Sequence, residues 1–161
     1  MISDVFGFEP VFAAIGGVSC LLRFNFKALY ALEKKYGTLR DALDALNSGS
    51  SDAVLDFVCA ACPGFRLDGP ASGGFDFGEV CGKVYEALLG CFSDPDGTDS
   101  PSGNRATDWD GVYFIARYRL LMSDGEFWDC TPRRFDKLHR MWLEERGIKM
   151  KQDIYTGDFS F

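Results

Sequence analysis

The sequence predicts a mainly α-helical protein: a small helical bundle with a short N-terminal β-hairpin, followed by a C-terminal helical hairpin. Apolar residues recur at helical spacing in several segments of this 161-residue chain, and capping residues or glycines stand at the segment ends. Residues 93–108, SDPDGTDSPSGNRATD, contain no aromatic and no large aliphatic side chain. We therefore expect a helical unit with the β element at 1–92, a flexible linker at 93–108 and a helical unit at 109–161.

The N-terminal β element is predicted by the stretch VFAAIGGVSCLLRFNF. Its two apolar runs flank Gly16 and Gly17, and consecutive glycines between such runs are typical of a tight hairpin turn. Runs this short do not distinguish a strand from a helix by themselves, so the prediction rests on the glycine pair.

A helix is expected next, over NFKALYALEKKYG. Asn25 can cap its start and Gly37 can end it. Glu33 and the lysines are expected largely away from the apolar face of this helix. That face is formed by four residues, of which the last three are expected to be mainly structural: Phe26, Leu29, Leu32 and Tyr36.

Two shorter helices complete an N-terminal cluster. Thr38 can cap LRDALDALNSG, which Gly49 stops, and Ser50 or Ser51 can cap DAVLDFVCAAC, which ends before a proline. Because the connections are short, we expect these helices to pack as an antiparallel group. A loop at 64–74 and a fourth helix over FDFGEVCGKVYEALLGCF follow.

Beyond the linker, a helix is expected from Trp109 to residue 121. Its spacing predicts one continuous face, formed by Trp109, Val112, Tyr113, Ala116 and Leu120. Ser123 or Asp124 can cap a short turn that carries two aromatic residues. This turn leads to the last helix, which Gly147 ends.

The last helix starts at a Thr-Pro pair. Thr131 can cap it, and Pro132 suits its first position because an N–H there would have no intrahelical partner. Phe127 and Trp128 precede this pair closely enough to fold back on the first turns, near Phe135. The opposite face carries four basic residues: Arg133, Arg134, Lys137 and Arg140. A solvated surface is the simplest interpretation of that face, and a partner-binding strip is the alternative.

The bulk composition excludes several function classes. The net charge of −7 and the pI of about 4.7 make the chain repel phosphate backbones, so we expect no nucleic-acid partner. No apolar stretch approaches the ~20 residues that a membrane-spanning helix needs. The N-terminus also lacks a signal-peptide pattern. We therefore expect a cytoplasmic protein without membrane contact, whose six cysteines are mostly reduced.

Two stretches carry a family resemblance. LLRFNFKALYALEKKYGTLRDALDAL contains a strand-like Leu-x-Phe, an Ala-Leu, a Leu-Glu, a Gly and a helix with spaced leucines. IARYRLLMSDGEFWDCTPRRFDKL contains a helix, a Phe-Trp, a Thr-Pro and a helix bearing Arg and Leu. In this order they resemble the tail assembly chaperones of long-tailed phages and of the related gene-transfer agents.

This resemblance implies a non-enzymatic role without a cofactor or metal. Such proteins associate with the tape-measure protein during tail assembly in the host cytoplasm, keep it soluble and help to recruit tail-tube subunits. They are absent from the mature virion. Many are made in a short and a frameshifted longer form, so another copy or a shorter form is a further expected partner. We expect the partner contacts at Phe127, Trp128, Arg133, Arg134 and Trp142.

Two alternatives from other classes remain open at this point. Cys59 and Cys62 have C-x-x-C spacing, which would suit a small cysteine-dependent metal-binding or redox protein, although small buried thiols are the simpler interpretation. A general helical adaptor is the other alternative. His139, the single histidine, is expected at a surface or boundary rather than in catalysis, and the acidic run DPDGTD lacks the Gly and Glu of a calcium loop.

Overall fold

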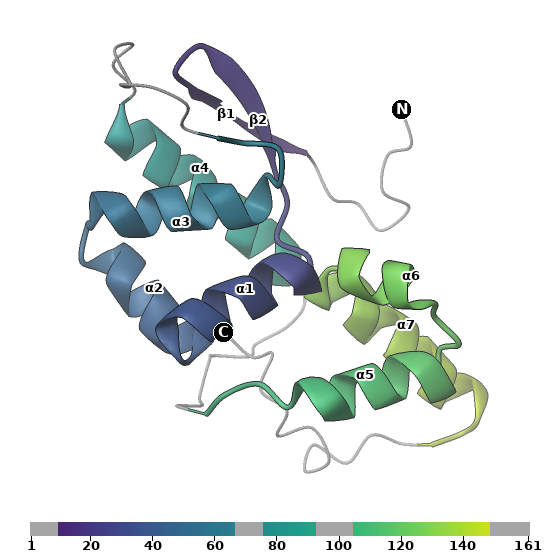
Figure 1. Ribbon diagram of the computed structural model, residues 1–161. Helices are drawn as coiled ribbons and strands as arrows, with labels where there is room; N and C mark the ends of the chain where they lie inside the picture. The colour runs from purple at the N-terminus through teal and green to yellow at the C-terminus, as the bar shows by residue number, and fades with distance from the viewer. Residues whose placement is uncertain (1–9, 67–75, 93–104, 149–161) are drawn as a thin grey trace.

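A computed structural model describes residues 10–66, 76–92 and 105–148, and it confirms the predicted fold class. Within these ranges a two-stranded antiparallel hairpin is followed by helices only (Figure 1). The elements are β1 (Val11–Ile15), β2 (Val18–Leu22), α1 (Phe26–Tyr36), α2 (Leu39–Asn47), α3 (Ser51–Ala61), α4 (Phe77–Phe92), α5 (Trp109–Tyr118), α6 (Asp124–Asp129) and α7 (Pro132–Glu145).

The glycine pair forms the hairpin turn, as predicted. Gly16 and Gly17 have φ angles of 57° and 80°, and a two-residue turn with positive φ at both positions matches the twist of antiparallel strands. Every second side chain of β1 is buried in the core, where α4 packs against this strand: Val11, Ala13 and Ile15. The hairpin projects at the top of the view in Figure 1, away from α5, α6 and α7.

The predicted caps of the N-terminal helices are confirmed. The Asn25 side chain accepts a hydrogen bond from the backbone of α1, and Gly37 ends that helix with a φ of 95°. Thr38 caps α2 and Ser50 caps α3, each through its side-chain oxygen. Each cap satisfies a backbone N–H that has no partner inside the helix, so the sequence determines these starting points locally.

The C-terminal helices differ from their prediction in two respects. Phe127 and Trp128 do not lie in a turn but in the short helix α6, which starts at a capping box between Ser123 and Glu126. The Ser123 N–H donates to the Glu126 carboxylate at 2.7 Å, and this bond lowers the pKa of Glu126. The α5 helix ends at Tyr118, before the predicted residue 121. Thr131 and Pro132 start α7 as predicted.

The helices on the two sides of residues 93–104 share one hydrophobic core. The α1 helix packs against α6, and α4 packs against α7. Figure 1 shows the start of α1 beside α6, where the Phe26 N–H donates to the Cys130 carbonyl oxygen at 2.9 Å. Most of the predicted linker (93–104), much of the predicted loop (67–74) and the tail (149–161) lie outside the described residues, so the division into two units stays a prediction.

Candidate functional site

Phe26 is the centre of an aromatic cluster that joins four helices. From α1, its ring centroid lies 5.8 Å from that of Trp109 in α5, 5.1 Å from Phe127 in α6 and 5.3 Å from Phe135 in α7. Phe26 is itself fully buried. Phe127 of the Phe-Trp pair and Phe135 thus both pack against Phe26, a ring from the N-terminal part of the chain. The sequence placed Phe26 on the buried face of α1 but carried no signal for its partners.

Phe127 belongs to this core and not to the surface. Its side chain is fully buried, and it packs against Phe26 and Tyr113. Because a buried ring is not presented to a partner, the predicted contact role does not fit Phe127 in this structure. The neighbouring Trp128 is only half-buried, so of the aromatic pair it is the ring that reaches the surface.

Three aromatic side chains form a surface feature that we call the aromatic patch: Tyr30, Trp109 and Trp128. Tyr30 lies 5.6 Å from Trp109 and 5.4 Å from Trp128, and the two indoles lie 6.4 Å apart. Tyr30 is 40% exposed and both tryptophans are half-buried. The patch unites α1, α5 and α6, so its rigid rings are held by a common core.

A buried carboxylate orients one ring of the aromatic patch. Glu33 accepts hydrogen bonds from the indole N–H of Trp109 at 3.1 Å and from the backbone N–H and hydroxyl of Thr107 at 3.0 and 2.6 Å. The sequence placed Glu33 away from the apolar face of α1, yet it is buried, because Thr107 at the end of the predicted linker and Trp109 in α5 donate to it there. Their bonds replace the water that the carboxylate loses on burial.

The predicted basic face of α7 is only partly open. Arg133, Arg134 and Arg140 are half-buried, and Lys137 is exposed. The Arg140 guanidinium pairs with Asp136 at 2.6 Å, one turn earlier on the same helix. An exposed i,i+4 pair contributes a few tenths of a kcal/mol to the helix, so local stabilisation accounts for part of this charge pattern.

Trp142 lies in a stack along α7 that starts at Phe135 of the aromatic cluster. Its ring is 6.1 Å from that of His139, which in turn is 6.2 Å from Phe135. The guanidinium carbons of Arg119 and Arg146 lie 5.3 and 4.3 Å from the Trp142 ring centroid, within cation–π range. Trp142 is half-buried, so this stack also reaches the surface.

His139 is buried in that stack rather than at the surface or boundary where we expected it. Burial, together with the nearby Arg119 guanidinium, lowers its pKa to about 4. The neutral imidazole Nε2 can then accept a hydrogen bond from Arg119 Nη1, 3.2 Å away, because guanidinium groups only donate. The contact fixes the end of α5 against the middle of α7.

An exposed apolar row on α5 and just after it was not predicted from the sequence, whose spacing indicated a different face of this helix. Phe114 and Tyr118 are exposed and their ring centroids lie 4.6 Å apart. Leu121 follows, 82% exposed and in the left-handed region with a φ of 54°. The Arg117 side chain donates a hydrogen bond to the carbonyl oxygen of Met122, the residue after Leu121, at 2.6 Å. The left-handed backbone that holds Leu121 outward carries a strain of about 1 kcal/mol or more.

The surroundings of Cys20 and Cys59 favour the unreactive thiol form. Burial and the neighbouring Cys62 raise the pKa of Cys20, while burial and the Asp56 charge raise that of Cys59. A raised pKa favours the thiol over the reactive thiolate. In the described ranges, no three His, Cys, Asp or Glu side chains are grouped as metal ligands. The acidic run DPDGTD lies outside those ranges.

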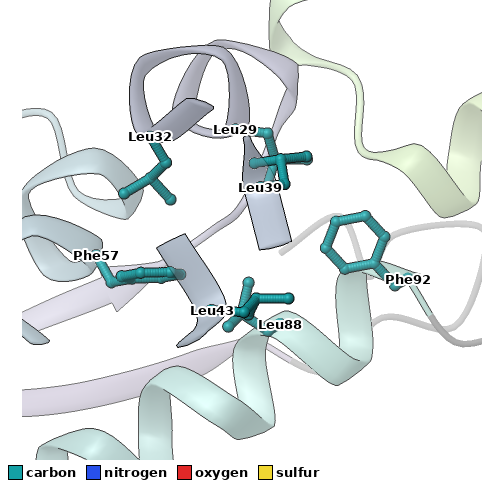
Figure 2. A pocket seen from close by; sticks show the side chains of 7 residues that line it. All are labelled: Leu29, Leu32, Leu39, Leu43, Phe57, Leu88 and Phe92. Atoms are coloured by element: carbon teal, nitrogen blue, oxygen red, sulfur yellow. The ribbon is translucent and has the colours of Figure 1, made fainter. Parts of the chain in front are cut away.

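Figure 2 shows a small cavity where α1, α2, α3 and α4 meet. Its volume is about 10 Å³, room for about one water molecule, and it is lined only by apolar side chains: Leu29, Leu32, Leu39, Leu43, Phe57, Leu88 and Phe92. A water here would lack hydrogen-bond partners. This cavity is therefore a packing defect and not a ligand site.

Comparison of the chain with models of protein families, with curated proteins and with solved structures gives no match in any of the three. None of the helices in the described ranges has the length and apolar character that crossing a membrane requires. The functional interpretation therefore rests on the residues and the geometry above.

Proposed function

We propose that this chain is a phage tail assembly chaperone. In this role it binds the tape-measure protein, keeps it soluble and helps to recruit tail-tube subunits in the host cytoplasm, and it is absent from the mature virion. The resemblance of two ordered segments to this family suggests the role. The observation that carries it is the aromatic patch of Tyr30, Trp109 and Trp128, because it is a rigid, half-exposed surface suited to apolar helices.

The chemistry of the patch matches the proposed partner. A tape-measure protein that has not yet been packed into a tail presents long helices with exposed apolar stripes, and such stripes bind hydrophobic surfaces through i, i+3, i+4 anchors. Tyrosine and tryptophan are enriched among residues that dominate binding energy, since their rings bury much area with few rotatable bonds. The exposed Phe114 and Tyr118 add apolar area on α5, one of the helices that forms the patch.

Burial separates the proposed contact residues into surface contacts and one supporting core residue. Trp128 is retained as the central contact, and Phe127 becomes the buried ring that supports it. Arg133, Arg134 and Trp142 on α7 stay proposed contacts. Several weak contacts of this kind along one extended partner would gain in strength through avidity.

Co-expression with the tape-measure protein encoded beside this chain tests the proposal. Soluble complex is scored by pull-down for the wild type, for Trp128→Ala and for Leu89→Ala, which removes an exposed apolar side chain from α4 outside the patch. We expect complex with the wild type and Leu89→Ala, and loss with Trp128→Ala while circular dichroism stays unchanged. A tape-measure protein that remains insoluble with the wild type would overturn the proposal.

A further inference from the structure

The outer face of the β-hairpin is apolar and exposed. The segment 10–22, PVFAAIGGVSCLL, contains no charged residue. Phe12 pairs directly with Leu21 across the two strands, and these side chains are 50% and 42% exposed. The α4 helix packs against β1 on the opposite, buried face. Two apolar side chains side by side on one sheet face form a surface that water solvates poorly.

The backbone of β1 also has an open edge. In a two-residue hairpin, Ile15 and Val18 beside the turn exchange both backbone hydrogen bonds, and the pattern then alternates along the strands. Phe12 and Ala14 therefore direct their N–H and C=O groups away from β2. In the described ranges, no backbone group from another element is bonded to either residue. A row of free donors and acceptors along an extended strand is the recognition surface for another strand.

We propose that β1 pairs antiparallel with β1 of a second copy of this chain. Pairing about a two-fold axis at Ala13 sets Phe12 opposite Ala14 of the second copy, so that a large side chain meets a small one. Each paired residue then gains partners for its N–H and C=O groups. The two hairpins then form one four-stranded sheet. A sheet needs about three strands or more to be stable by itself, so this sheet is more stable than either hairpin alone.

The charge distribution favours a second copy at this place. Two chains that each carry a net charge of −7 repel each other, so self-association needs a surface that brings no charge into the contact. Residues 10–22 provide one. Natural edge strands usually carry a charge, a proline or a bulge that blocks pairing, and β1 has none of these between Val11 and Ile15.

The edge of β1 fits this role better than that of β2. Directly after β2, the Arg23 N–H donates to the Ala61 carbonyl oxygen at 3.2 Å, and β2 contacts α3. A neighbouring strand on that side would meet the end of α3. The inference does not depend on the proposed chaperone function. In that context, a dimer would present two aromatic patches to one extended partner.

Sedimentation equilibrium of the full chain over a range of concentrations tests the proposal. Ala14→Pro removes the outward N–H on the β1 edge without touching the bonds between β1 and β2, and Phe12→Lys places a charge on the exposed face. Ser19→Pro is the matched control, because Ser19 pairs with Ala14 and directs its N–H to the β2 edge. We expect a dimer for the wild type and Ser19→Pro, and an association at least about tenfold weaker for Ala14→Pro and Phe12→Lys.

Circular dichroism and hydrogen exchange make the outcomes distinct. In the wild type, protection of the Phe12 and Ala14 amides should increase with protein concentration, while all variants keep the helical circular dichroism spectrum. A wild type that stays monomeric, or a dimer that Ala14→Pro leaves unchanged, would overturn the proposal. Strong protection of the Ala14 amide in a monomer would also overturn it, since the chain itself would then cover the edge.

Discussion

The Glu33 carboxylate in α1 accepts a hydrogen bond from the indole N–H of Trp109 in α5, at 3.1 Å and across 76 positions of sequence. Glu33 is buried and also accepts two bonds from Thr107. This single side chain therefore satisfies three donors, two from Thr107 at the end of the predicted linker and one from Trp109 directly after it. It holds the start of α5 on α1 and orients a ring of the aromatic patch.

Replacement of Glu33 should destabilise the protein strongly. Glu33→Ala leaves the Thr107 and Trp109 donors without their acceptor, and we expect the free energy of unfolding to fall by about 2–4 kcal/mol. Glu33→Gln keeps an acceptor and should lose less. Urea denaturation measures both variants against Glu144→Ala, a substitution at an exposed position of α7. A change below about 0.5 kcal/mol in Glu33→Ala would show that these bonds do not hold the two groups of helices together.

Truncation of Phe26 should disrupt the common core. Its ring contacts rings from α5, α6 and α7, so Phe26→Ala opens a cavity at the junction of all four helices. We expect a loss of about 3–5 kcal/mol, and of less than about 1 kcal/mol for Phe12→Ala on the exposed hairpin face. Thermal unfolding followed by circular dichroism compares the two. Similar losses in both variants would contradict the central position of Phe26.

The stability of the protein should decrease as the pH falls from about 6.5 to about 4. The pKa of His139 is lowered to about 4 in the folded chain. The unfolded chain therefore binds more protons between about pH 6.5 and about pH 4, which stabilises the unfolded state relative to the folded state. The contribution of His139 is complete above pH 6.5 and is on the order of 3 kcal/mol smaller near pH 4. His139→Gln should remove this component of the pH dependence, since glutamine does not titrate.

Proton NMR provides the direct measurement for His139. As the single histidine, it gives one pair of imidazole C–H signals that can be followed through a pH titration of the folded protein. A midpoint near 4 agrees with a buried ring beside Arg119. A midpoint near 6.5 would mean that the imidazole is solvated and that α5 and α7 are not joined through this contact.

Thiol modification should discriminate sharply among the cysteines. Cys59 is exposed, whereas Cys20, Cys91 and Cys130 are buried. We expect Cys59 to react first with a thiol reagent, slowly at neutral pH and faster as the pH rises, because its pKa is raised. Mass spectrometry after brief labelling identifies the modified residue. Rapid reaction at pH 7, or loss of folding in Cys59→Ser, would favour the cysteine-dependent alternative.

Local structure was predictable from local sequence. The Gly16–Gly17 turn and the caps at Asn25, Thr38 and Thr131 follow from conformational preferences and hydrogen bonds within a few residues, so no distant contact is needed to place them. One local detail differs from the prediction. The capping box between Ser123 and Glu126 starts a short helix, so Phe127 and Trp128 lie in α6 and not in a turn.

The sequence by itself therefore determined the helical fold class, the hairpin and most of the helix starts, since these depend on spacing and on short-range bonds. Only the tertiary structure decided which aromatic rings are buried and which are presented. Phe127 and Trp128 are neighbours with the same kind of side chain, yet one lies against Phe26 and the other reaches the surface beside Tyr30. Burial depends on contacts between helices far apart in the chain, and the pattern of a single helix does not contain those contacts.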